Sequence, residues 1–288
     1  MQPLKMGGKE LLRIFLKGNE DLTGSLLSRE EGGRALDRSL RDLIAEKYGG
    51  SVKVEVFHEA CGRSELLLQQ LDGMSPPKDW RAIGLGDAAN GVMAECESRV
   101  FEESMDVLVL SLQPEIIHSL WRHRQSGYLI YPHPSWERQW PPAWHQWFRE
   151  QFSPVGLLQV DQFTDNYLRL IRAIKARLDV HILVYNCSSF DPNDRTHNYY
   201  GHDDTLALRI HKFNLALMKL SALEGISIID VDRLLAELGA ERHTLGALRY
   251  SPAAHQVICR EFLRVLEDIG FFESRPLIIQ LGQPRASR

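Results

Sequence analysis

The chain has 288 residues, 44% of them apolar, and a formal net charge of −4. Its length and apolar content predict one large domain, or one domain with insertions, with enough core to fold unaided. No basic block runs along the chain, so nucleic acid is a poor candidate for a partner. No stretch of ~18 apolar residues occurs, and the sequence therefore predicts no membrane-spanning helix and no membrane partner.

The N-terminus and the cysteines indicate a compartment. The first residues, MQPLKMGGKELLRIFLKG, lack the apolar region and the small-residue cleavage site of a signal peptide. The four cysteines are far apart and form no CxxC pair, so we expect reduced thiols in a cytoplasm rather than a structural zinc. They are Cys61, Cys96, Cys187 and Cys259. We expect neither a metal nor another cofactor.

Five apolar runs rich in strand-forming residues predict buried strands. In chain order they are Leu11–Leu16, Val52–Phe57, Asp106–Leu112, Val180–Tyr185 and Ile226–Val231. Helical patterns lie between them. They cover Gly33–Lys47, Thr164–Leu178, Leu206–Leu223 and a last helix with Ser251 as N-cap, Pro252 in its first turn and Gly270 as its stop. Strands that alternate with helices predict a three-layer α/β/α sandwich around a central five-stranded parallel sheet.

One segment, Tyr131–Gly156, stands apart because it is dense in proline and aromatic residues. It holds four of the six tryptophans. They are Trp136, Trp140, Trp144 and Trp147. One interpretation is a surface insertion that packs its own small cluster. The other is a lid or a contact surface for an oligomer or another partner, since tryptophan supplies large contact area in such places.

Polar residues and glycines follow the predicted strands at the end where parallel sheets bind ligands. Asn19 and Glu20 come after the first strand, and Gly62 comes after the second. Gln113 stands at the end of the third strand. The segment GALRYSPAAH lies between the fifth strand and the last helix. We therefore expect these residues to meet at one edge of the sheet.

From Leu11 to Phe271, this order of elements resembles the SGNH/GDSL hydrolase family. That family carries a nucleophilic serine in a Gly-Asp-Ser turn after its first strand, a glycine after the second and an asparagine after the third. An Asp-x-x-His pair precedes its last helix. The resemblance implies a flavodoxin-like sandwich and an enzyme that acts on acyl esters or thioesters. It also implies a small molecule or a biosynthetic intermediate as the substrate.

When the family's catalytic positions are matched to this chain one by one, other residue types stand at them. Glu20 stands at the serine position. With the helix start anchored on YSPAAH, Gly246 and Arg249 stand at the Asp and His positions. A serine mechanism needs a base within hydrogen-bond reach of a hydroxyl, so this sequence argues against ordinary serine-ester hydrolysis.

The positions that would bind substrate or oxyanion are better retained. Gly62 matches the family's glycine, and Gln113, at the asparagine position, still offers an amide donor. Asn19 lies directly before Glu20. The segment DPNDRTHNYYGHDD is rich in turn-forming residues and predicts a solvated loop. The resemblance implies that such a loop often borders the site, so His197 is a candidate for contact with substrate.

The register of the final motif leaves an alternative open. His255 lies one turn inside the last helix, and a shift of one helical turn would bring it into the site as a catalytic residue. The other interpretation is a histidine packed against the sheet.

Glu20 and Arg249 face each other in this alignment, which also admits two interpretations. Either they form a salt bridge that fills the old pocket, or Arg249 binds an anionic substrate while Glu20 acts as base or nucleophile. Three functions therefore stay open. They are an acyl ester or thioester enzyme with a non-standard catalytic set, acting on a neutral, anionic or carrier-bound small molecule; an enzyme of another reaction class that reuses the pocket; and a non-catalytic protein that binds a ligand or partner.

Overall fold

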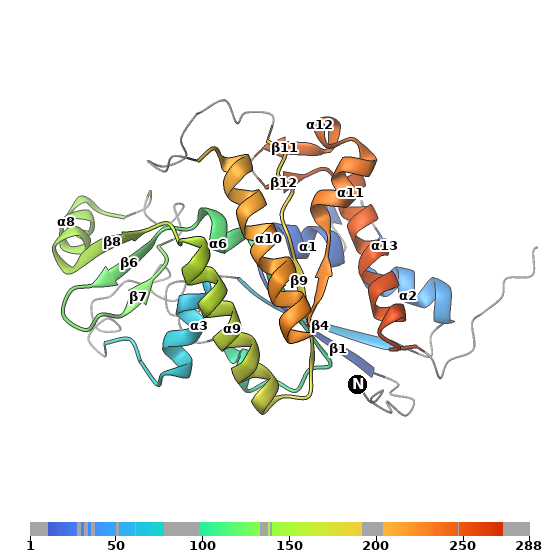
Figure 1. Ribbon diagram of the computed structural model, residues 1–288, viewed down its shortest axis with the longest axis horizontal. Coiled ribbons are helices and arrows are strands. Elements are labelled where there is room, and N and C mark those ends of the chain that lie inside the picture. The colour runs from blue at the N-terminus through green and yellow to red at the C-terminus, as the bar shows by residue number, and fades with distance from the viewer. Residues whose placement is uncertain are drawn as a thin grey trace, which may run out of the picture.

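A computed structural model describes residues 11–27, 30–31, 34–35, 38–49, 52–60, 62–77, 98–132, 138, 140–191, 204–246 and 248–272. A five-stranded parallel sheet forms its centre, in the order β10-β9-β5-β1-β4 (Figure 1). The strands are β1 (Leu11–Lys17), β4 (Lys53–Glu59), β5 (Val107–Ser111), β9 (His181–Tyr185) and β10 (Ser227–Ile229). The predicted α/β/α sandwich and its five strands are confirmed. The strand order reverses at β1, so the carboxyl ends of β1 and β5 form the switch point at which such sheets bind ligands.

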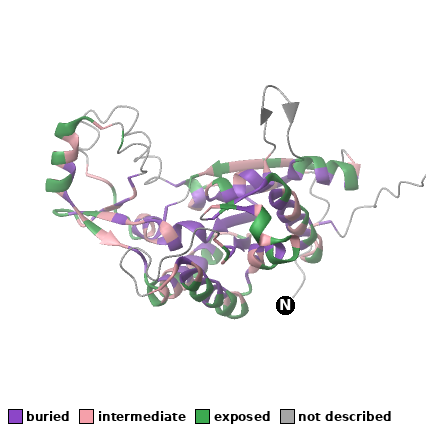
Figure 2. Cartoon of the chain, turned by 90° about the horizontal axis from the view of Figure 1, so that it is seen from above, coloured by how far each residue is buried: buried purple, intermediate pink, exposed green. Residues whose placement is uncertain are grey.

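Helices cover both faces of the sheet (Figure 1). One face carries α1 (Glu20–Leu26), α2 (Leu40–Tyr48), α11 (Val231–Leu238) and α13 (Pro252–Asp268); the other carries α3 (Ser64–Leu71), α6 (Gln113–Ile117), α9 (Val160–Arg177) and α10 (Leu206–Glu224). Seen from above, burial is concentrated in the sheet and on the inner sides of the helices (Figure 2).

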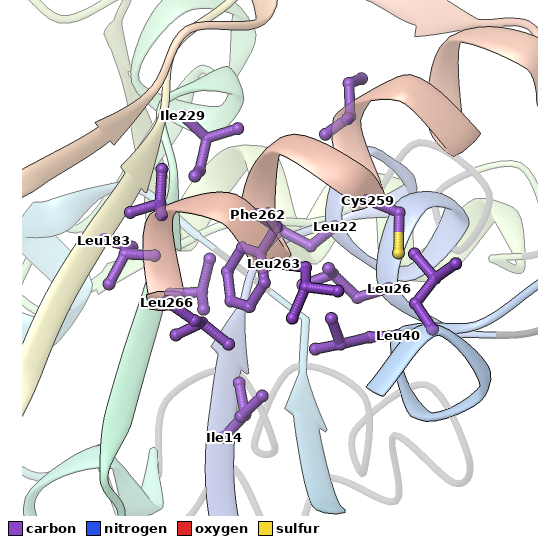
Figure 3. Packing of buried hydrophobic residues seen from close by; sticks show 14 of the residues in the cluster. Ile14, Leu22, Leu26, Leu40, Leu183, Ile229, Cys259, Phe262, Leu263 and Leu266 are labelled. Carbon is purple, nitrogen blue, oxygen red and sulfur yellow. The ribbon is translucent and has the colours of Figure 1, made fainter. Parts of the chain in front are cut away.

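The sheet has one hydrophobic core on each face, because successive side chains of a strand point to opposite faces. Ile14 of β1 belongs to the core under α13, whereas its neighbour Phe15 belongs to the core under α9 and α10. In Figure 3, Phe262 and Leu266 of α13 point towards the sheet, on the side where Ile14 lies. Because β5 is covered on both faces, all five of its residues are buried.

The helix starts follow from local capping. Ser251 accepts a hydrogen bond from the backbone N–H of Ala254 and begins α13, as the sequence predicts. The predicted start of the helix Gly33–Lys47 is wrong. That helix, α2, begins at Leu40, because Ser39 and Asp42 form a reciprocal capping box.

Residues before α2 are extended instead. The strands β2 (Glu30–Glu31) and β3 (Arg34–Ala35) pair with each other in an antiparallel hairpin. The apolar spacing of this region therefore predicts a longer helix than the chain forms.

A second small sheet projects from the main body (Figure 1). Its strands are β6 (Leu120–His123), β7 (Leu129–Ile130) and β8 (Phe152–Gly156), and α8 (Pro142–Gln151) precedes β8. We call these elements the Trp-rich arm. Tyr128, Ile130, Phe148 and Phe152 form its own buried cluster, against which three tryptophans pack. These are Trp121, Trp140 and Trp147. Trp136 lies outside the described residues.

Shorter elements complete the fold. The helix α12 (Ala240–His243) leads into a hairpin of β11 (Thr244–Gly246) and β12 (Arg249–Tyr250), which precedes α13. The 3-10 helix η2 (Arg99–Phe101) precedes β5. Within the described ranges, no helix is both long enough and apolar enough to span a bilayer.

The turn after β1 requires glycine for steric reasons. A Cβ on Gly18 would approach the Ser111 Cβ to 2.8 Å and would also overlap Leu22. A Cβ on Gly62 would overlap mainly the end of the flexible Leu66 side chain, which can move aside.

We therefore expect Gly18→Ala to lower the free energy of unfolding by about 1–3 kcal/mol, as overpacking does elsewhere. Gly62→Ala is the matched control and should cost clearly less. Urea unfolding followed by circular dichroism measures both. Equal losses in the two variants would contradict the steric account of the β1–β5 contact.

Candidate functional site

The site is built from the ends of three neighbouring strands. Because β1 lies between β5 and β4, the residues that follow them are brought to one edge of the sheet. Asn19 is the half-buried N-cap of α1, and Glu20 is its exposed first residue. Gly62 is buried just before α3, and Gln113 is buried at the start of α6. The edge thus brings together the residues that the sequence predicts after strands one to three.

The fifth predicted residue, Arg249, reaches this edge by a different path. It is an exposed residue of β12, and β12 lies against α1. The strand of Arg249 and the helix that begins with Glu20 are therefore in contact. Both side chains are exposed, so water would screen a charge interaction between them more than it would at a buried site.

Beneath Glu20, a buried carboxyl group joins the strand ends. The hydroxyl of Ser111 donates to Asp21 Oδ2 at 2.5 Å, and the backbone N–H of Asn19 donates to Asp21 Oδ1 at 3.2 Å. The backbone N–H of Gln113 in turn donates to Ser111 Oγ at 3.1 Å. Burial raises the pKa of Asp21, and the bonds from Ser111 and the backbone oppose that rise. Asp21 therefore fastens α1 to the end of β5.

The Gln113 side chain supports the hairpin before α13. Its Nε2 donates to the carbonyl oxygen of Leu248 at 3.0 Å. Leu248 is buried and has a φ of 57°, in the left-handed region that non-glycine residues rarely occupy. The Gln113 amide therefore helps to hold a strained residue one position before Arg249. An amide nitrogen carries two N–H donors, so this bond does not use the whole donor capacity of Gln113.

A second buried layer lies behind Asp21. Ser25 donates to the Asp21 carbonyl oxygen at 2.8 Å and lies 3.3 Å from the Tyr185 hydroxyl. The Tyr250 hydroxyl accepts the backbone N–H of Ser188 at 3.1 Å. These bonds connect α1, β9 and β12 beneath the exposed residues of the edge.

The thiol of Cys187 belongs to the same layer. Burial raises its pKa well above the usual range, and the charges of Asp21 and Asp232 add to the rise. A nucleophilic cysteine needs a lowered pKa, so these surroundings do not favour Cys187 as a nucleophile. Cys61, the cysteine nearest to Gly62 in sequence, lies outside the described residues.

Two predicted histidines have different outcomes. His255 is a buried residue of α13 whose ring meets that of Tyr250 edge to face, with centroids 6.1 Å apart. This position matches the packing interpretation of His255. His197 lies outside the described residues, and its predicted contact with substrate stays a prediction. In the part of the chain that the structure describes, no three His, Cys, Asp or Glu side chains converge as a metal site requires.

Next to Gly62, a buried glutamate caps α3. Glu115 accepts the backbone N–H of Ser64 at 2.6 Å and the Ser64 hydroxyl at 3.1 Å. Burial, with the charge of nearby Glu65, raises the pKa of Glu115 to about 8, although Arg63 and the bonds from Ser64 act in the opposite direction. No separate signal in the sequence marks Glu115, which looks like an ordinary helix residue after a proline.

Two buried arginines hold the base of the Trp-rich arm. Arg63, directly after Gly62, donates to the carbonyl oxygens of His118 at 3.2 Å and Gly156 at 2.5 Å. Arg209 of α10 donates to the carbonyl oxygens of Ile116 at 2.9 Å and Leu158 at 2.6 Å. The arm therefore enters and leaves the main body at fixed points beside the edge.

An ion pair between a buried lysine and a half-buried glutamate closes the edge on the β4 side. Lys17 Nζ lies 3.1 Å from Glu59 Oε2, and Ser98 Oγ donates to the same oxygen at 2.6 Å. Burial alone would raise the pKa of Glu59, but Lys17 and the hydrogen bonds lower it overall. The glutamate is thus an ionised partner of Lys17. Sequence reasoning missed this pair, because each member reads as the polar end of a strand.

Comparison with known proteins supports the fold. No protein-family model matches the chain, and no curated protein sequence does. Among solved structures, a variant of Axe2, an acetyl-xylooligosaccharide esterase from Geobacillus stearothermophilus, matches with a TM-score of 0.51 at 10% identity, covering 93% of this chain and 97% of that one. A second Axe2 variant matches with a TM-score of 0.50 at 9% identity, covering 91% and 98%. The fold is that of the SGNH hydrolases.

A protein described as a candidate SGNH hydrolase from Slackia heliotrinireducens also matches. Its TM-score is 0.46 at 12% identity, with 89% of this chain and 99% of that one covered. Identities this low show the fold alone. The roles of Glu20, Arg249 and the residues around them therefore stay predictions.

Because its pKa is raised, Glu115 makes a contribution to the free energy of unfolding that depends on pH. The folded protein keeps a proton on this carboxyl up to pH about 8, whereas an ordinary glutamate releases it near 4.5. Between these values the folded state binds the extra proton, so its contribution to stability is complete below pH 4.5 and is lost as pH rises through about 8.

Glu115→Gln removes this titration and keeps a carbonyl oxygen for the Ser64 N–H. We expect the stability of the wild type, relative to Glu115→Gln, to fall on the order of a few kcal/mol across this pH range. Urea unfolding at several pH values measures it, with the exposed Glu102→Gln as control. Parallel pH curves for wild type and Glu115→Gln would show that Glu115 is ionised in the folded protein.

Proposed function

We propose that the chain hydrolyses or transfers the acyl group of a small ester or thioester, with Glu20 in the place that serine occupies in the SGNH family. One observation carries the proposal. Glu20 is an exposed carboxylate at the end of β1, between strands whose ends carry Gly62 and Gln113. Axe2 is named as an acetyl-xylooligosaccharide esterase, which makes short acyl esters the first compounds to try.

In the proposed hydrolysis, Glu20 acts as a general base. Its carboxylate takes a proton from a water molecule while the water oxygen bonds to the acyl carbon. The Gly62 N–H and an N–H of Gln113 donate to the carbonyl oxygen as it gains negative charge. The bond from the acyl carbon to the alcohol or thiol then breaks, and the proton passes from Glu20 to the departing oxygen or sulfur. In a transfer reaction, an acceptor hydroxyl replaces the water.

The surroundings of Glu20 favour an anionic or carrier-bound substrate. Arg249 is exposed on the strand that lies against α1, and a guanidinium binds carboxylate or phosphate groups in a two-pronged geometry. A phosphate or carboxylate away from the reacting carbon would orient the substrate without taking part in the chemistry.

Removal of the base should abolish turnover. We expect Glu20→Gln to lower kcat on short acyl esters or thioesters about 100-fold or more, the usual contribution of a general base. Exposed Glu102→Gln should keep wild-type activity. Glu20→Ser supplies a hydroxyl without a base and should not recover activity. Release of acid from a panel of such substrates measures all four proteins. Wild-type turnover that survives Glu20→Gln would refute the assignment.

A second candidate function is anion binding without catalysis. It is favoured by the hydrogen bond from Gln113 to the Leu248 carbonyl oxygen, because that amide then serves the hairpin rather than a reaction intermediate. On this account the edge holds a ligand through Arg249, and the replaced serine and histidine mark a lost reaction.

This candidate predicts that Arg249→Leu weakens the binding of inorganic phosphate or acetyl phosphate about tenfold, the loss expected for one charge-assisted contact. Arg122→Leu, at an exposed position of the Trp-rich arm, is the control. Isothermal titration calorimetry measures the affinities. Binding that is unchanged in Arg249→Leu, or equally weakened in Arg122→Leu, would count against a site at Arg249.

A further inference from the structure

The parallel pairing of β1 with β4 ends just before the turn that carries Glu20. Its last paired residues are Lys17 and Glu59, and the N–H of the next residue, Gly18, donates to the Glu59 carbonyl oxygen at 3.2 Å. Because β4 ends at Glu59, the ladder does not continue to the carbonyl group of Gly18. A main-chain carbonyl group in this position needs a donor from elsewhere.

The imidazole ring of His58 supplies that donor. Its Nε2 lies 2.8 Å from the Gly18 carbonyl oxygen. Because a carbonyl oxygen can only accept a hydrogen bond, the Nε2 atom carries a proton in this contact. His58 is an exposed residue of β4, the edge strand of the sheet (Figure 1). Its ring nevertheless binds the main chain of the neighbouring strand.

The same peptide group is held from its other side. The backbone N–H of Asn19 donates to Asp21 Oδ1 at 3.2 Å. Both the C=O and the N–H of the peptide between Gly18 and Asn19 therefore have a side-chain partner. His58 comes from β4, whereas Asp21 comes from the first turn of α1. Two different elements thus fix the plane of this one peptide.

These bonds matter because glycine supplies little stiffness of its own. Gly18 is required for steric reasons, since the Ser111 Cβ leaves no room for a Cβ there. Glycine also reaches more backbone conformations than any other residue, so the peptide that follows it can rotate unless its polar groups are bound. Glu20 follows Asn19 directly. A rotation of the peptide would therefore change the direction in which the start of α1 presents the Glu20 carboxylate.

We propose that His58 is a positioning residue of the candidate site. Its Nε2–H holds the peptide between Gly18 and Asn19 and thereby sets the direction of Glu20. The proposal rests on the proposed function, in which Glu20 is the base. Because the bond acts on the base and not on the substrate, its loss should lower the rate of the chemical step and leave the affinity for substrate unchanged. The bond and its effect on the rate can be measured separately.

The kinetic test uses two substitutions at one position. His58→Leu removes the donor, whereas His58→Gln keeps a side-chain N–H. On short acyl esters we expect His58→Leu to lower kcat about tenfold, the usual effect of one hydrogen bond, and to change KM less than about twofold. His58→Gln should recover most of the loss. His211→Leu, at an exposed position of α10, should match the wild type, and circular dichroism should show native folding in all variants.

The second test observes the bond itself and needs no substrate. With the ring in its neutral form, NMR of the ring nitrogens should find the His58 proton on Nε2. The Asn19 amide should exchange with solvent about tenfold faster in His58→Leu than in the wild type, and His58→Gln should restore slow exchange. A neutral ring that carries its proton on Nδ1, or an Asn19 exchange rate that does not change, would overturn the proposal.

The two tests also separate this proposal from the proposed function. A wild type without turnover would refute the proposed hydrolysis, while the NMR result would still decide whether His58 holds the peptide. Turnover that is lost in Glu20→Gln but unchanged in His58→Leu would refute the role of His58 alone. A rise in KM with kcat unchanged in His58→Leu would refute it as well, because it would place His58 in substrate binding.

Discussion

The close contact between the ends of β1 and β5 is the constraint on which the candidate site depends. Gly18 leaves room for the Ser111 Cβ, and Ser111 donates to the buried carboxyl of Asp21. Asp21 belongs to α1, so this bond also fixes the helix that begins with Glu20. Gln113 follows Ser111 and reaches across to the hairpin that carries Arg249. One chain of contacts thus sets the relative positions of the exposed carboxylate and the exposed guanidinium.

Buried polar groups form the layer below these two residues. Burying a carboxyl or an ammonium group is costly unless it is paired or hydrogen-bonded. Each such group has partners here: Asp21 with Ser111, Glu115 with Ser64 and Lys17 with Glu59. Because these contacts are satisfied locally, they fix the backbone at the edge. In general, a rigid layer beneath a binding site lowers the free-energy cost of ordering the site when a ligand binds.

The fold was predictable because its strands are local apolar runs, whose order along the chain implies a parallel sheet. The meeting of Glu20, Gly62 and Gln113 was predictable for the same reason, since parallel strands end at one edge. The roles of Asp21 and Glu115 were not, because each depends on a partner about 50 to 90 residues away in sequence. The direction of His255 depends on the turn of α13 from which it projects, which is fixed by the Ser251 cap and not by the histidine itself.

The arginines beneath the Trp-rich arm have a consequence for how this protein can change. Arg63 and Arg209 bind the arm's base through main-chain carbonyl oxygens, which every amino acid supplies. These bonds therefore do not depend on which side chain stands at each of the four positions. The arm can therefore change in sequence or length between the contacts of Arg63 and Arg209 without a change in the central sheet. The arm is in this sense a segment whose sequence can vary while the candidate site beside it stays the same.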